Sequence, residues 1–231
     1  MTKRTNLLLA LLTTVLLTVT AEKNPGAVNT AQHSRLWYEN IAASAAHTVC
    51  CIAQDSSRVI WMGTEKGLYT YDGYNCYPHR LADDEANSRI HCLLIHEGRL
   101  YAGSERGLLV FSLLTERYET ATAMGPADIR ALALDSDGRG LLLGAADGVY
   151  RYDLKDGNLH LVGQTASAVY ALLPLRQGFV AGTINGLMVY DRWGHSKTLR
   201  LVDGRQPLVN ALLYDKGRQT YWIGTEGRLL K

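Results

Sequence analysis

The sequence predicts an all-β protein, a β-propeller with four complete four-stranded blades and a truncated fifth. A Gly-x-x-x-Gly turn recurs at intervals of 38 to 42 residues, and alternating, aromatic-rich runs flank each copy. A further apolar segment with a small residue at a fixed place precedes each turn. The chain has 22 glycines and 13 tyrosines but only 2 phenylalanines, which suits short strands and turns. Four antiparallel strands repeated about every 40 residues are typical of propeller blades.

The N-terminus is predicted to be a signal peptide. Lys3 and Arg4 precede the apolar run Leu7–Val19, and small residues at Val19-Thr20-Ala21 offer a cleavage site. An uncleaved membrane anchor is the alternative, although the run is short for a spanning helix. Cleavage after Ala21 would lower the formal charge from +2 to 0. The segment that remains would then lack the excess of basic residues that is typical of a nucleic-acid-binding protein.

The remaining chain divides by its repeats. Residues 22–34 are predicted to be a linker and residues 35–231 a partial propeller. The segment Arg35–Asn40 has strand character and could complete the fifth blade of a small closed ring. We favour an open arc of a larger ring of seven blades, in a chain that is a fragment. The expected blade units are about 47–83, 88–124, 127–165, 167–205 and 207–231.

The paired glycines are predicted to mark a tight turn between two strands. A phosphate-binding loop would need Lys and Ser or Thr after the second glycine and a following helix. Leu68-Tyr69 follows the first copy instead, within strand-like sequence. The turn glycines are Gly63, Gly67, Gly103, Gly107, Gly144, Gly148, Gly182, Gly186 and Gly224.

A column of small residues precedes each turn, where the innermost strands of neighbouring blades would converge. Its members are Cys51, Cys92, Ala131, Ala171 and Ala211. Cysteine behaves as a small hydrophobe in such places, so packing is favoured over a disulfide for Cys51 and Cys92. Cys50 and Cys76 have no obvious partner, and the cysteine spacing is not that of a zinc site.

One variable column is the candidate binding site. The residue before the small column is Cys50, His91, Arg130, Tyr170 or Asn210. Starts of inner strands open toward one face of a propeller, where polar and aromatic side chains can hydrogen-bond and stack a sugar. The alternative is that the column lines a wet channel. The predicted ligand-binding residues are His91, Arg130, Tyr170 and Asn210.

No catalytic, metal or cofactor site is predicted. The segment Asp135–Gly140 (DSDGRG) has part of the residue pattern of a calcium-binding loop. It lacks the distal acidic ligand and is interpreted as a turn. The histidines are scattered without metal-ligand spacing. The chain contains no kinase phospho-acceptor motif or nucleotide-binding glycine box.

The best-preserved repeats resemble the regulator-propeller repeat of periplasmic sensors in Bacteroidetes hybrid two-component histidine kinases. Its pattern "V-x-A-L-x-x-D … lWiGT-x-x-GLyrYD" is carried by Val49, Asp55, Trp61, Gly63, Thr64, Gly67, Leu68, Tyr69, Tyr71 and Asp72. A second match is carried by Val209, Asp215, Trp222, Gly224 and Thr225. The resemblance covers nearly all of the chain after the signal peptide.

The resemblance implies an exported, periplasmic sensor propeller that responds to glycan-derived oligosaccharides and controls genes for polysaccharide use. Its implied partners are the missing blades, the downstream signalling modules and a second copy in a homodimer, with no nucleic acid bound by this segment. A full-length relative would be a histidine kinase, but this chain would not be an enzyme. The alternatives are a free-standing secreted propeller that binds glycan or protein without signalling, and a propeller enzyme.

Overall fold

The computed structural model describes residues 48–80, 88–119, 124–201 and 206–231. All of them belong to the unit that spans residues 40–231. The predicted signal peptide and linker, and the segment Arg35–Asn40, lie outside the described residues. Within those ranges every regular element is a β-strand, and no helix is present that could cross a membrane.

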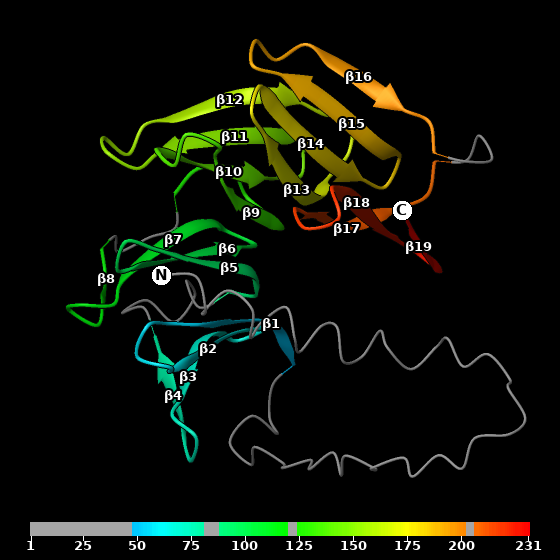
Figure 1. Cartoon of the computed structure of the whole chain (residues 1–231). Coiled ribbons are helices and arrows are strands. Elements are labelled where there is room, and N and C mark those ends of the chain that lie inside the picture. The colour runs from blue at the N-terminus through cyan, green and yellow to red at the C-terminus, as the bar shows by residue number, and fades with distance from the viewer. Residues whose placement is uncertain (1–47, 81–87, 120–123, 202–205) are drawn as a thin grey trace, which may run out of the picture. The chain divides into compact units, whose positions relative to one another are not determined.

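The strands form five antiparallel sheets that follow one another along the chain (Figure 1). The first sheet contains β1 (Val49–Gln54), β2 (Ile60–Thr64), β3 (Gly67–Tyr71) and β4 (Cys76–His79). The second contains β5 (Ile90–His96), β6 (Arg99–Ser104), β7 (Gly107–Ser112) and β8 (Arg117–Tyr118). The third contains β9 (Ala131–Leu134), β10 (Gly140–Gly144), β11 (Gly148–Asp153) and β12 (Leu159–Gln164). The fourth contains β13 (Val169–Leu175), β14 (Gly178–Thr183), β15 (Gly186–Asp191) and β16 (Ser196–Leu199). The fifth contains β17 (Val209–Asp215), β18 (Thr220–Thr225) and β19 (Arg228–Leu230).

Each sheet is a simple meander in which consecutive strands pair. The first turn of the first sheet shows why the Asp and Trp of the repeat occur together. The Asp55 carboxylate accepts hydrogen bonds from the backbone N–H groups of Ser57 and Val59 at 2.8 and 3.0 Å. Its second oxygen accepts one from Trp61 Nε1 at 2.9 Å. One carboxylate therefore closes the hairpin and fixes a core aromatic side chain.

A buried hydroxyl closes the glycine-bounded turn. Thr64 Oγ1 donates to the Gly67 carbonyl at 2.9 Å and accepts from the Lys66 N–H at 3.1 Å. Ser104 and Thr183 make the same pair of bonds in the second and fourth sheets. Because buried polar groups need partners, this turn suits a Ser or Thr after the first glycine. The third sheet has Ala145 there and lacks the bond.

The two glycines of the first turn have different roles. Gly67 has a φ of 107°, a left-handed conformation that favours glycine at the corner. Gly63 lies within β2, where an added Cβ would come within 2.4 Å of Cys51 Sγ and 2.6 Å of Ile90 Cγ2. The first glycine therefore permits the next sheet to approach closely, which differs from the corner role expected from the sequence.

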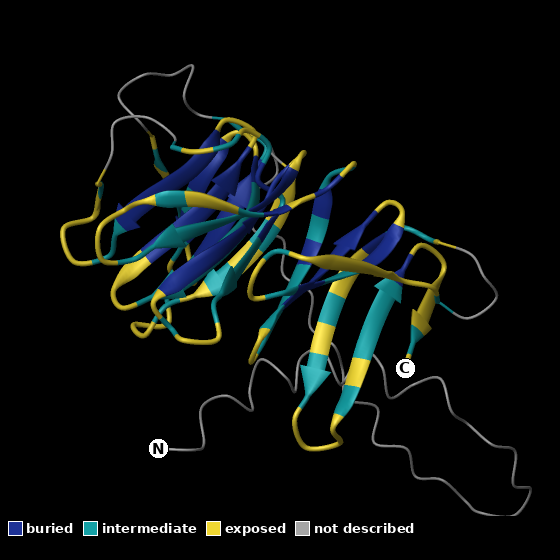
Figure 2. Cartoon of the chain, turned by 90° about the horizontal axis from the view of Figure 1, so that it is seen from above, coloured by how far each residue is buried: buried dark blue, intermediate teal, exposed yellow. Residues whose placement is uncertain are grey.

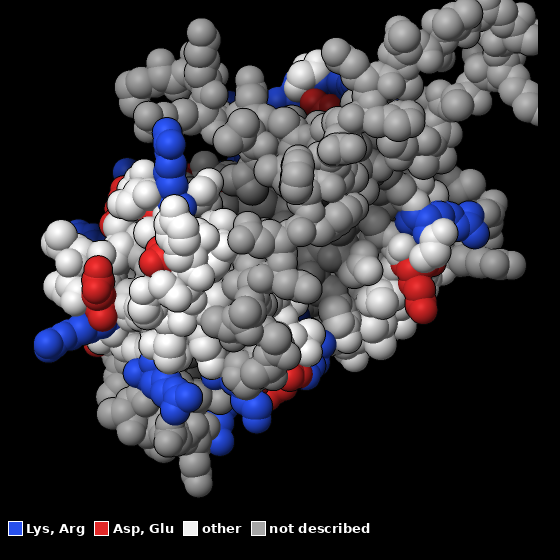
Figure 3. Space-filling model, turned by 90° about the horizontal axis from the view of Figure 1, so that it is seen from below, with Lys and Arg blue, Asp and Glu red and all other residues white. Residues whose placement is uncertain are grey.

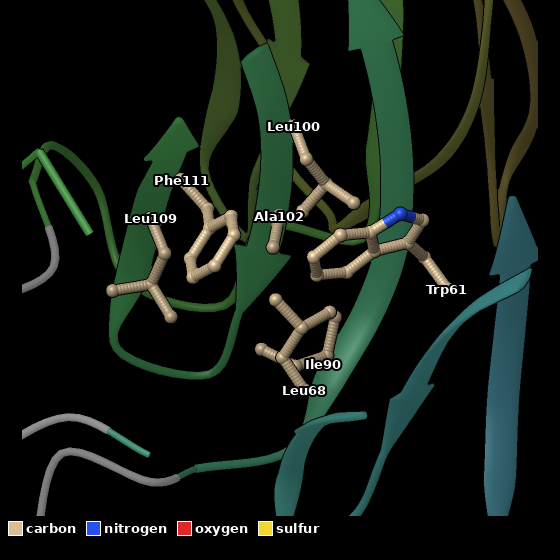
Figure 4. Close-up of a cluster of buried hydrophobic side chains, with 7 residues drawn as sticks. All are labelled: Trp61, Leu68, Ile90, Leu100, Ala102, Leu109 and Phe111. Atoms are coloured by element: carbon tan, nitrogen blue, oxygen red, sulfur yellow. The ribbon is translucent and has the colours of Figure 1, made fainter. Parts of the chain in front are cut away.

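Neighbouring sheets share apolar cores. Trp61 and Leu68 of the first sheet pack with Ile90, Leu100 and other residues of the second. Figure 4 shows this cluster, in which the Trp61 and Phe111 rings lie 5.1 Å apart. The same arrangement recurs between later sheets. Figure 2 shows buried residues concentrated in the strands and exposed ones at the connecting turns.

The small-residue column lies at these junctions. Cys51 pairs with Gly63, Cys92 with Gly103, and the equivalent alanines with the equivalent glycines. All four cysteines are free, and burial raises the pKa of the Cys51 thiol to about 12. The cysteines of this column therefore pack as small side chains, as the sequence predicts.

Contacts between sheets run in chain order, from the first to the second and so on to the fifth. Among the described strands, no contact of similar extent joins the first sheet to the fifth. The predicted fourth strand of the second sheet is short, since β8 spans only two residues before a bridge between Leu108 and Met124. The predicted meander of repeated sheets is confirmed.

Candidate functional site

The candidate column coincides with a backbone irregularity. In the first, second, fourth and fifth sheets the register shifts by one residue near the start of the first strand. A β-bulge of this kind turns its extra side chain away from the regular alternation. The extra residues are Cys50, His91, Tyr170 and Asn210. Arg130 directly precedes β9, and its N–H donates to the Gly144 carbonyl at 2.8 Å.

Three of the four predicted residues meet in one polar cluster that crosses three sheets. Arg130 Nε donates to Asp128 Oδ2 at 2.9 Å. The Arg130 guanidinium also lies over the Tyr170 ring, 5.2 Å from its centre. His91 Nε2 lies 3.2 Å from Asp128 Oδ1. We call His91, Asp128, Arg130 and Tyr170 the rim cluster.

The loop before the third sheet holds Asp128 in place. Its N–H donates to the Glu105 carbonyl at 2.9 Å, and the next N–H, of Ile129, donates to the Ser104 carbonyl at 3.0 Å. Ile129 is fully buried, so it anchors the loop against the second sheet. Asp128 has a φ of 57°, a left-handed conformation that Asp and Asn adopt more readily than most residues. The loop thus places the carboxylate between His91 and Arg130.

Burial decides the charge of His91. Its side chain is 14% exposed, against 33% for that of Arg130. Burial lowers the pKa of His91, the Arg130 charge lowers it further, and the Asp128 carboxylate opposes both. The imidazole is therefore neutral at pH 7. His91 Nε2 and Asp128 Oδ1 are both buried and make no hydrogen bond within the described part of the chain.

A second guanidinium lies close by. Arg89 forms ion pairs with Glu65 at 3.5 Å and with Glu105 at 3.8 Å. Arg89 and Glu105 also both influence the His91 titration. The rim cluster therefore has a border of paired charges at the turns of the first two sheets.

The fourth predicted residue stays apart from the cluster. Asn210 is exposed, and no hydrogen bond, ion pair or ring contact among the described residues joins it to the other three. Cys50, the bulge residue of the first sheet, is exposed too, and its Sγ lies 3.9 Å from the Thr48 carbonyl. Asp128 was not predicted. The only sequence signal for it is an acidic residue two places before Arg130, in a linker of variable length.

The DSDGRG segment holds an arginine between carboxylates. Arg151 donates to Asp135 at 2.8 Å, to Asp137 at 3.0 Å and to Asp153 at 3.4 Å. Gly140 makes room for it, since a Cβ there would meet the guanidinium at 2.7 Å. Within the described ranges, this segment included, no group of three or more His, Cys, Asp or Glu side chains could hold a metal ion.

On the face shown in Figure 3, surface charge marks no further site among the described residues. On the described part of the face in Figure 3, basic and acidic side chains are interspersed and do not form a patch of one sign. The fold and the rim cluster together define a repeat propeller whose polar groups suit binding of a ligand.

Comparison with solved structures supports this class. Two structures of the extracellular domain of BT4673 from B. thetaiotaomicron match with TM-scores of 0.71 and 0.70, at 35% and 34% sequence identity. One is described as a "putative one component system" and the other as a "putative hybrid two component system". Each match covers 83% of this chain, and 27% and 26% of those chains. This chain thus spans about a quarter of the length of these two extracellular domains.

A third structure shows likeness of fold alone. It is the extracellular domain of the "putative hybrid two component system" BT3049 from B. thetaiotaomicron, with a TM-score of 0.67 and 17% identity over 78% of this chain and 28% of that one. No family model matches the chain, and no curated protein shows significant similarity to it. The resemblance to hybrid two-component sensors and the predicted propeller fold are confirmed.

Proposed function

We propose that this chain is the exported sensing propeller of a hybrid two-component regulator and that it binds glycan-derived oligosaccharides in the periplasm. The observation that carries the proposal is the rim cluster, in which residues of three sheets meet, two of them at bulged strand starts. An aromatic ring beside hydrogen-bonding groups is the usual composition of a sugar site. The likeness to extracellular domains of two-component systems supports the sensing role.

Ligand binding at the rim cluster would pass a signal to the other modules of the regulator. In this proposal the additional blades and downstream signalling modules belong to the same protein, and ligand binding controls genes for polysaccharide use. The signal peptide predicted at residues 1–21 supports export. The chain itself contributes recognition, and catalysis belongs to a histidine kinase module elsewhere in the protein.

Calorimetric titration of the full chain with a panel of oligosaccharides tests the proposal. Arg130→Ala and Tyr170→Ala should each weaken binding by at least about tenfold, because stacking and charge-assisted hydrogen bonds are lost. Arg176→Ala and Tyr74→Ala are matched controls, since both side chains are exposed on turns away from the cluster. Unchanged affinity in both rim variants, or binding of no oligosaccharide by the unaltered chain, would contradict the proposal.

A further inference from the structure

The charges around the rim cluster are already balanced before any ligand arrives. Arg130 is paired with Asp128, and Arg89 is paired with Glu65 and Glu105. His91 adds no charge because burial lowers its pKa. Both guanidinium groups therefore already face carboxylates, so neither offers an uncompensated positive charge to a ligand. An anionic ligand would have to compete with Asp128, Glu65 and Glu105 for these groups.

The remaining hydrogen-bonding capacity suits hydroxyl groups. Arg130 Nε donates to Asp128, and the guanidinium carbon lies over the Tyr170 ring, 5.2 Å from its centre. The terminal nitrogens of Arg130 make no hydrogen bond to the described residues, and the side chain is one-third exposed. A guanidinium held in this way presents a fixed fork of donors to two neighbouring oxygens. Vicinal hydroxyls of a sugar offer that pair of acceptors without adding a charge.

We infer that Asp128 sets the ligand class of the rim cluster: the site takes uncharged sugars and discriminates against uronic acids and sulfated sugars. The inference rests on the proposed function and specifies its substrate. Asp128 acts as a positioning and specificity-determining residue. It orients Arg130 and neutralises the charge that would otherwise attract an acidic sugar.

Asp128→Asn is the informative change. Asn keeps a side-chain oxygen that can accept from Arg130 Nε, and it tolerates the left-handed backbone of this position. It removes one negative charge, so the two guanidinium groups would face two carboxylates. Asp156→Asn is the matched control, because that carboxylate lies on the turn between β11 and β12 and bonds only Asn158.

The experiment titrates the full chain with pairs of disaccharides that differ only by a C6 carboxylate, such as α-1,4-linked digalactose and digalacturonic acid, and the equivalent glucose-based pair. The unaltered chain should bind the neutral member at least about tenfold more tightly. Asp128→Asn should lower this preference by about tenfold, and more at 50 mM than at 300 mM salt, because charges are screened less at low ionic strength. The control variant should keep the original preference.

The outcomes separate the two proposals. Equal or tighter binding of the acidic member by the unaltered chain, or an unchanged preference in Asp128→Asn, overturns this inference and leaves oligosaccharide sensing intact. Binding of neither member, in a chain that also binds no other oligosaccharide of a broad panel, overturns the proposed function and this inference with it. If Asp128→Asn does not fold, its thermal melt will show this. The preference of the unaltered chain for the neutral disaccharide would then test the inference.

Discussion

Because neighbouring sheets approach closely at Gly103, we predict that adding even one methyl group there, as in Gly103→Ala, destabilises the fold. A Cβ on Gly103 would lie 2.8 Å from the Ile129 carbonyl oxygen, 2.7 Å from Ile129 Cγ2 and 2.5 Å from Cys92 Sγ. Cys92 can change rotamer, but the Ile129 backbone oxygen can move only with the loop that carries it. Overpacking of this kind costs about 1–3 kcal/mol. The lower entropy of alanine in the unfolded chain offsets about 0.4–1 kcal/mol of that cost.

Gly103→Ala should therefore destabilise the fold by about 1–2 kcal/mol. Each kcal/mol lowers the melting temperature by about 2–4 °C for a chain of this size. Urea unfolding followed by tryptophan fluorescence measures the effect, because Trp61 lies in the core between the first two sheets.

Gly217→Ala is the matched control for this prediction. Gly217 lies on a turn, and the nearest atom to an added Cβ is Asp215 Oδ1 at 3.4 Å. The control should be neutral or slightly stabilising, because it gains the entropic effect without the clash. Equal stability of Gly103→Ala and Gly217→Ala would refute the close-approach reasoning.

Two other predictions concern charged groups. Arg151→Met should destabilise the third sheet by about 1–2 kcal/mol, since it leaves three partly exposed carboxylates without their cation. Urea unfolding at low salt measures this effect, and an unchanged free energy of unfolding would contradict the prediction. Burial lowers the pKa of His79, which bonds Thr70 Oγ1 and contacts the Trp61 ring at a tilt and the Phe111 ring edge-on. The unfolded state therefore binds the proton more readily, so stability should fall as the pH drops below about 6.5. His79→Gln should flatten the fall in melting temperature between pH 8 and pH 5.5, and an unchanged slope would exclude His79 as a source.

The sequence predicts the fold well because each element of the blade occurs several times and the copies can be compared with one another. A single GTEKG segment cannot be distinguished from a ligand loop, whereas five copies with matching flanks define a turn between two strands. The roles within the turn are less visible. Gly63 and Gly67 look alike in the sequence, and only the distances to Cys51 and Ile90 show that the first glycine serves packing between sheets.

The sequence predicts only part of the rim cluster, and for a physical reason. His91, Arg130 and Tyr170 stand out because they vary within a conserved frame of repeats, so their column can be read from the sequence. Asp128 lies in a linker whose length differs between blades, and no repeat position marks it. Asn210 was expected with the others because it shares their column, yet a shared column fixes the backbone position and does not create a contact.

The bulge explains how one blade position can vary while its neighbours cannot. Ile90 and Val169, which precede the bulge, are buried against adjacent sheets, and so is Ala171, which follows it. The bulged side chain belongs to neither packed face, so its size and charge do not disturb the contacts between sheets. His91 and Tyr170 can therefore differ although the residues beside them are buried. A propeller built from such blades can change this residue while keeping its core, and in the proposed function two residues of this kind, His91 and Tyr170, contribute to the ligand site.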